Sequence, residues 1–63
     1  MQKREAERYL GKKVRVILSN RFHFSGTVLE VSEDTLILLD KFNIEVSIKL
    51  LDIMVCSEVF NGH

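Results

Sequence analysis

The chain has 63 residues, no net formal charge and 29% charged residues. A chain this short forms one domain, and it buries only about 60% of the surface that its unfolded form exposes. Small domains need extra burial or a cross-link. A single cysteine excludes an internal disulfide, and the two histidines, His23 and His63, lie too far apart to suggest a metal site. We therefore expect oligomerisation, without metal or cofactor, to supply the missing burial.

The sequence also bears on the compartment of the protein. No apolar run reaches the roughly 18 residues that a membrane-spanning helix requires, and the charged N-terminus is unlike a signal peptide. Its lone cysteine, Cys56, fits a reducing environment. These features predict a cytoplasmic protein.

The charges are distributed unevenly along the chain. Residues 1–21 carry seven Lys or Arg against two Glu, a net charge of +5, and residues 22–63 carry −5. Such a chain can bind phosphate with its basic end, or copies can align opposite ends. Internal ion pairs and solubility are the alternative explanation.

Residues 2–10 are expected to form a short helix, because they are strong helix formers without Gly or Pro. Ala6, Tyr9 and Leu10 are spaced as one apolar stripe that would pack on the rest of the domain. Gly11 follows where a helix C-cap favours glycine.

Five strands are predicted after the helix, at about residues 12–19, 22–31, 35–40, 44–50 and 53–60. Val14, Val16 and Leu18 alternate as a half-buried strand does, and Asn20-Arg21 suits a tight turn. Residues 40–43 and 51–52 are expected to form a turn and a short 3₁₀ helix, and residues 61–63 a tail.

The second strand changes which residues face inward. Its inward set begins with Phe22, Phe24 and Val28 and continues with Leu29 and Val31. Gly26 precedes this change, and a glycine or bulge allows one long strand to bend and serve two sheets. We therefore predict one all-β domain over residues 1–63, a five-stranded, strongly bent SH3-like barrel with an N-terminal helix.

The last two strands suggest an assembly edge. The fourth alternates, with Ile44, Val46, Ile48 and Leu50 inward, whereas the last is apolar on both faces. A terminal strand of that kind invites aggregation unless a partner strand covers it. The expected oligomer interface consists of Val46, Ile48, Ile53, Met54, Val55 and Cys56.

The order of these elements, with the V-x-V-x-L strand and Gly26, resembles the Sm and Sm-like (LSm) family over most of residues 3–59. Phe24 matches an apolar position of the family's first motif. The resemblance implies a homo-oligomeric ring of roughly five to eight copies, closed by pairing the fourth strand with a neighbour's fifth, in RNA-processing assemblies. The related small barrel of ribosome-maturation factors, which is monomeric, also suits the V-x-V-x-L, F-x-G-x-V and L-x-D-I pieces.

The chain departs from the family at its RNA-binding positions. Where the family has an aspartate and an asparagine, this chain has Ser32 and Leu36. If the alignment is shifted by one or two residues, Asp34 takes the aspartate position, but no asparagine follows. The family's Arg-Gly pair is replaced by Val55-Cys56-Ser57. The uridine pocket that the family uses is therefore absent or remade.

Residues that could support catalysis are isolated. His23 is expected to be a surface or interface residue and Cys56 a small apolar filler, and no glycine-rich phosphate loop exists. Ser32-Glu33-Asp34 is expected to be a solvated turn, with cation binding as the alternative. We therefore predict that the protein is not an enzyme.

The basic end favours binding of single-stranded RNA by charge and stacking. The candidate RNA-binding residues are Arg4, Arg8, Lys12, Lys13, Arg15 and Arg21. Tyr9, Phe42 and Phe60 are the aromatics available for stacking, and each is expected to be packed instead. The alternative is an oligomeric scaffold or protein-interaction module that binds no nucleic acid.

Overall fold

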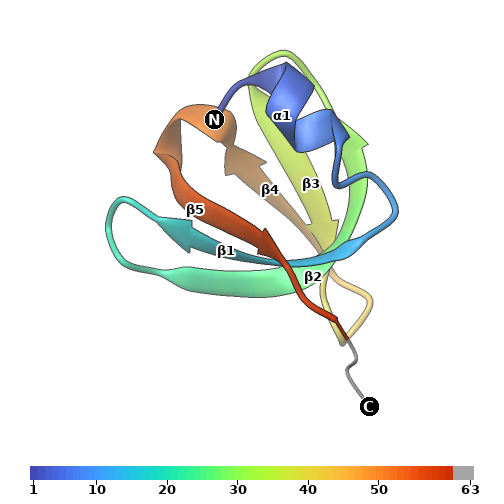
Figure 1. Ribbon diagram of the computed structural model, residues 1–63. Helices are drawn as coiled ribbons and strands as arrows, with labels where there is room; N and C mark the ends of the chain where they lie inside the picture. The colour runs from blue at the N-terminus through green and yellow to red at the C-terminus, as the bar shows by residue number, and fades with distance from the viewer. Residues whose placement is uncertain (61–63) are drawn as a thin grey trace.

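A computed structural model describes residues 1–60 as a bent antiparallel sheet with a short helix at one end (Figure 1). The expected tail, residues 61–63, lies outside the described residues. The elements are α1 (Lys3–Glu7), β1 (Lys13–Leu18), β2 (His23–Val31), β3 (Thr35–Leu39), β4 (Glu45–Lys49), the 3₁₀ helix η1 (Leu50–Asp52) and β5 (Ile53–Glu58).

The five strands are ordered β4-β3-β2-β1-β5, with every neighbouring pair antiparallel. This arrangement confirms the predicted all-β class and the five-stranded small barrel-like fold. The barrel is not closed by hydrogen bonds, because β4 and β5 are the two edges of the sheet. Within residues 1–60, no helix is long and apolar enough to cross a membrane.

The helix α1 is shorter than predicted. It holds five residues and its C-cap is Arg8, so the expected glycine cap is wrong, although Gly11 takes a positive φ of 77° in the turn that follows. Ala6 is fully buried and Tyr9 packs against the core, but Leu10 is 45% exposed. The predicted apolar stripe is therefore wrong at Leu10, because the helix ends before that residue.

The strand β2 bends as the sequence predicts. Its first half pairs with β1 and its second half with β3, and Thr27 pairs with both Lys13 and Leu39. Gly26 lies at this crossing, where a Cβ would fall against the carbonyl oxygen of Leu39 and 2.9 Å from its carbonyl carbon. Close backbone approach is therefore the reason that glycine occupies this position.

Three residues expected to face inward in the strands are exposed instead. Leu29 is 45% exposed, because a β-bulge between Val28 and Glu30 turns it out of the alternation. Phe22 is 62% exposed and Ile44 is 57% exposed, and each lies just before the strand to which the sequence assigns it. At both places the alternation of apolar residues in the sequence extends beyond the end of the hydrogen-bonded strand.

Both predicted hairpin turns are present with asparagine in them. In the β1–β2 turn, Arg21 takes the positive φ of 71°, and the side chain of Asn20 accepts from the Phe22 amide at 3.1 Å. In the β3–β4 turn, Asn43 takes a φ of 61°, and Asp40 accepts from two backbone amides.

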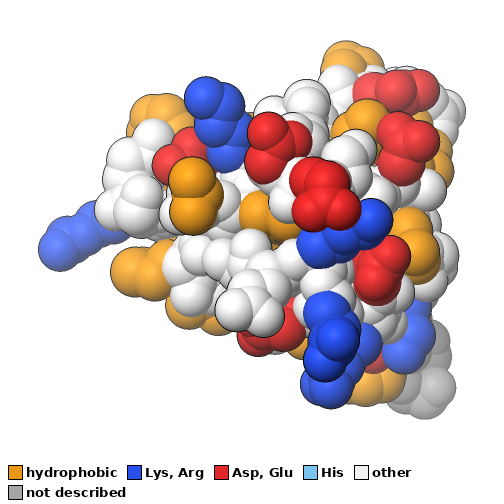
Figure 2. Space-filling model, turned by 90° about the horizontal axis from the view of Figure 1, so that it is seen from above, with side chains coloured by type: hydrophobic (Ala, Val, Ile, Leu, Met, Phe, Trp, Pro, Cys, Tyr) orange, Lys and Arg blue, Asp and Glu red, His pale blue; other side chains and the backbone are white. Residues whose placement is uncertain are grey.

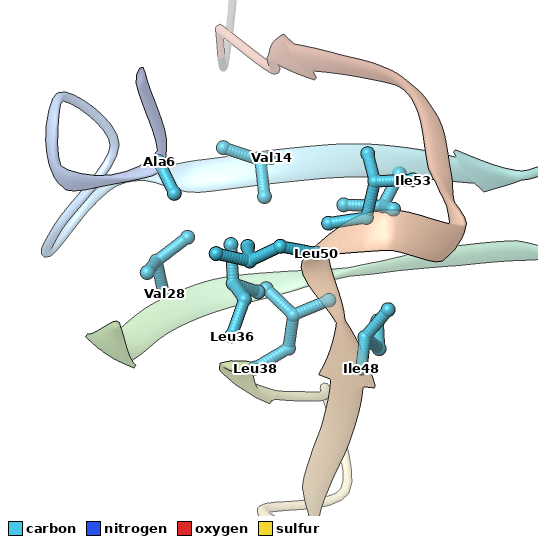
Figure 3. Close-up of a cluster of buried hydrophobic side chains, with 9 residues drawn as sticks. Ala6, Val14, Val28, Leu36, Leu38, Ile48, Leu50 and Ile53 are labelled. Carbon is cyan, nitrogen blue, oxygen red and sulfur yellow. The ribbon is translucent and has the colours of Figure 1, made fainter. Parts of the chain in front are cut away.

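The core lies inside the bend, between the sheet and α1 (Figure 3). All five strands, α1 and η1 contribute side chains to it, and no polar side chain is buried within residues 1–60. The core residues are Ala6, Val14, Val16, Val28, Leu36, Leu38, Ile48, Leu50 and Ile53.

Candidate nucleic-acid and assembly surfaces

The outer surface of β1 carries two of the predicted RNA-binding residues. Val14 and Val16 point into the core, and Lys13 and Arg15 therefore point to solvent on the opposite face. The strand pairing then places polar neighbours on both sides of Arg15, with Ser25 on β2 and Ser57 on β5. A cation flanked by two hydroxyls can bind an anionic oxygen by charge and by hydrogen bonds.

The neighbouring rows extend this surface. Ile17 lies between His23 and Val55, and Lys13 lies opposite Thr27. Together these residues form what we call the basic face, and none of them is acidic. The basic face consists of Lys13, Arg15, Ile17, His23, Ser25, Thr27, Val55 and Ser57.

The other four predicted RNA-binding residues lie elsewhere. Lys12 forms an ion pair with Glu58 at 3.7 Å, and Arg21 is in the β1–β2 turn. Arg4 belongs to α1, and Arg8 caps its C-terminus. Figure 2 views the molecule from the α1 end, where Lys and Arg side chains alternate with Asp and Glu rather than forming one basic patch. The structure therefore gathers only Lys13 and Arg15 on one face.

Three aromatic side chains, those of Phe22, Phe42 and Phe60, are more exposed than predicted. Phe42 is 70% exposed and Phe60 is 76% exposed, so the expectation that they would be packed is wrong. The ammonium of Lys41 lies 5.3 Å from the centre of the Phe42 ring. The expectation is confirmed for Tyr9, which packs against the core and donates a hydrogen bond from its hydroxyl to the Cys56 carbonyl at 3.4 Å. Phe42 and Phe60 therefore lie outside the basic face, which itself carries the exposed ring of His23.

The two sheet edges present unpaired backbone groups. The Val59 amide donates to Lys13 in β1, and because these groups alternate along a strand, those of Cys56 and Glu58 point away from β1, where the Cys56 carbonyl already accepts from the Tyr9 hydroxyl. By the same alternation, the Ile44 carbonyl accepts from Asp40 on the β3 side, which leaves Glu45, Ser47 and Lys49 with groups at the β4 edge. Both edges can accept another strand.

The predicted interface residues differ in their exposure. Ile48 and Ile53 are only 4% and 8% exposed and belong to the core of this chain. Val46 and Cys56 are half-buried against the core, and burial raises the pKa of the Cys56 thiol. Met54 and Val55 are exposed on β5, so they are the members of the set whose side chains a neighbour can contact directly.

An open groove of about 550 Å³ lies between α1 and β5. Its lining comes from both elements: Met1, Glu5, Arg8, Tyr9, Ile53, Met54, Val55 and Cys56. Sequence reasoning did not find this groove, because it depends on how α1 docks beside the sheet. The available signal in the sequence was that Tyr9 belongs to an apolar stripe and that the last strand is apolar on both faces.

Metal-binding groups are dispersed within residues 1–60. No three His, Cys, Asp or Glu side chains there come close enough to hold a metal ion. Ser32, Glu33 and Asp34 are exposed, which confirms the solvated turn, and Glu33 pairs with Lys3 at 3.4 Å. The raised pKa of Cys56 keeps its thiol protonated and poorly nucleophilic at neutral pH.

Comparison with known proteins adds no relative to this description. No protein-family model matches the chain, and no curated protein or solved structure gives a significant match.

Proposed function

We propose that this protein is an Sm-like ring-forming protein that binds single-stranded RNA through the basic face. The observation that carries the proposal is the location of Lys13 and Arg15 on the outer face of β1, where the residues paired with them on β2 and β5 carry no carboxylate. RNA phosphates supply the complementary charge, and the hydroxyls of Ser25, Thr27 and Ser57 supply further hydrogen-bond partners.

Ring formation is supported by the two free edges. Each copy has one β4 edge and one β5 edge, so a contact between them is heterologous and repeats around a ring. Assembly also repeats the basic face once per copy, and a strand of RNA that touches several copies gains affinity through avidity. One chain contributes only two cations to the basic face. We therefore expect appreciable affinity for RNA only in the assembled ring.

The function that we propose is binding rather than catalysis, in the cytoplasm. His23 lies opposite Ile17 on β1 and follows Phe22 in the chain, so apolar residues flank the histidine of the basic face. The exposed aromatics Phe42 and Phe60 provide stacking surfaces in place of the family's loop residues.

The test is a titration of a fluorescent uridine-rich oligonucleotide at several salt concentrations. The double variant Lys13→Gln/Arg15→Gln should bind more weakly, with a salt slope flatter by about 0.7 for each phosphate that the variant no longer neutralises. The control Lys3→Gln/Lys41→Gln removes the same charge outside the basic face and should keep the wild-type slope. Unchanged affinity and slope in the first variant would refute binding through this face.

A second candidate function is an oligomeric scaffold that binds protein and no nucleic acid. The departures from the Sm-like pattern at Ser32, Leu36 and Cys56-Ser57 favour it, because the edges for assembly are present without the family's RNA-binding residues. This candidate predicts an intact oligomer that retains no oligonucleotide at about 0.15 M salt.

A further inference from the structure

The groove between α1 and β5 has a defined direction. At one end the Met1 amine donates to the Leu50 carbonyl at 3.0 Å, and at the other the Tyr9 hydroxyl donates to the Cys56 carbonyl at 3.4 Å. The segment that contains α1 therefore runs alongside β5 in the same direction (Figure 1). Along this wall an acidic residue, Glu5, precedes a basic residue, Arg8, and both are exposed.

The β4 edge carries the matching charges. Glu45 begins β4 and Lys49 ends it, and both side chains are exposed. Their backbone groups are among those unpaired at the edge, so both residues would lie directly opposite a strand added there. Arg8 and Glu45 form no ion pair within residues 1–60.

We propose that the β4 edge of a second copy of this chain lies in the groove, antiparallel to β5, with Glu45 against Arg8 and Lys49 against Glu5. This inference rests on the ring assembly proposed above and adds the groups that orient it. Antiparallel addition places Lys49 beside the start of β5, where Glu5 lies, and Glu45 farther along, where Arg8 lies. Parallel addition would instead place like charges together at both ends.

The side chains of the added strand would also point toward α1. The backbone of Cys56 points to the β5 edge, where its carbonyl accepts from the Tyr9 hydroxyl. Its side chain packs against the core, on the side of the sheet where Ala6 and Tyr9 of the α1 segment lie. Residues directly opposite in a ladder have side chains on the same face. Glu45 and Lys49 of the second copy therefore face the wall of the groove that carries Arg8 and Glu5.

The test uses two charge-reversal variants, Arg8→Glu and Glu45→Arg, examined by native mass spectrometry. Each alone places like charges at every contact, and we expect association to weaken about fivefold or more per contact, compounded around the ring. An equimolar mixture restores opposite charges wherever the two variants alternate, at every contact of an even-numbered ring and at all but one of an odd-numbered ring, so mixed oligomers should form again. Their different masses identify them.

The control is Arg4→Glu, which makes the same change on α1 outside the groove and should assemble as the wild type does. A second pair, Glu5→Lys with Lys49→Glu, repeats the test if one of the first variants fails to fold. Single variants that assemble normally, or mixtures no better than either variant alone, would overturn the ion pairs while leaving the ring intact. A monomeric wild-type protein would instead refute the ring itself.

Discussion

Replacement of Gly26 by alanine tests the physical account of the bend. A Cβ at this position would meet the carbonyl oxygen of Leu39 and lie 2.9 Å from its carbon, so the backbone of β2 or β3 must move. Overpacking of this kind costs about 1–3 kcal/mol, and the stiffer unfolded chain of alanine returns about 0.4–1 kcal/mol. We expect the free energy of unfolding to fall by about 1–2 kcal/mol, out of a total of about 3–9 kcal/mol for a chain of this length.

The assay is thermal and urea unfolding followed by circular dichroism at one fixed protein concentration, because assembly makes the melting temperature concentration-dependent. The expected loss corresponds to a Tm about 4–16 °C lower. Since the obstacle is backbone, Leu39→Ala should not rescue the variant. The control Gly11→Asn has open space and an amino acid that tolerates positive φ, and should change stability little. A Tm for Gly26→Ala equal to that of the wild type would refute the reasoning.

Three further predictions follow from burial and exposure. Leu36→Ala removes a fully buried side chain and should cost about 2–5 kcal/mol of unfolding free energy, measured by urea titration, whereas Leu51→Ala, at 88% exposure, should be nearly neutral. Because burial raises the pKa of Cys56, the unfolded chain loses the thiol proton first as pH rises. The contribution of this thiol to stability is therefore complete at neutral pH and is lost as the pH rises from the ordinary thiol pKa to the raised pKa of the folded protein. The urea midpoint of the wild type should fall between pH 7 and 10 for this reason, and the Cys56→Val variant should lack that fall. Val55→Lys should prevent assembly in size-exclusion chromatography under either proposed function while leaving the circular dichroism spectrum unchanged, and an intact oligomer would contradict the β5 edge as an interface.

The sequence predicted the fold best where local rules are strong. Val14 and Val16 follow the two-residue period of a half-buried strand, and both are fully buried. Gly11 takes a positive φ and Gly26 permits a close backbone approach, which few other residues tolerate. Such features depend on a few neighbouring positions, so they can be read without knowledge of the rest of the structure.

Predictions failed where the answer depends on contacts between distant segments. The bulge beside Leu29 arises from the pairing of β2 with β3, and hydrophobicity alone does not reveal it. The six candidate RNA-binding residues are close in sequence, but α1, the turn and β1 separate them in space. Only the strand register shows that Lys13 and Arg15 share a face with Ser25 and Ser57. The same limit applies to the groove, because its two walls are far apart along the chain.

The most direct test of the proposed function is native mass spectrometry of the purified protein with and without a uridine-rich oligonucleotide. We predict one closed oligomer of roughly five to eight copies that gains one oligonucleotide, because the two free edges repeat the contact and the basic face is repeated with it. The same oligomer without an oligonucleotide would contradict RNA binding and favour the scaffold. A monomer would contradict the ring itself.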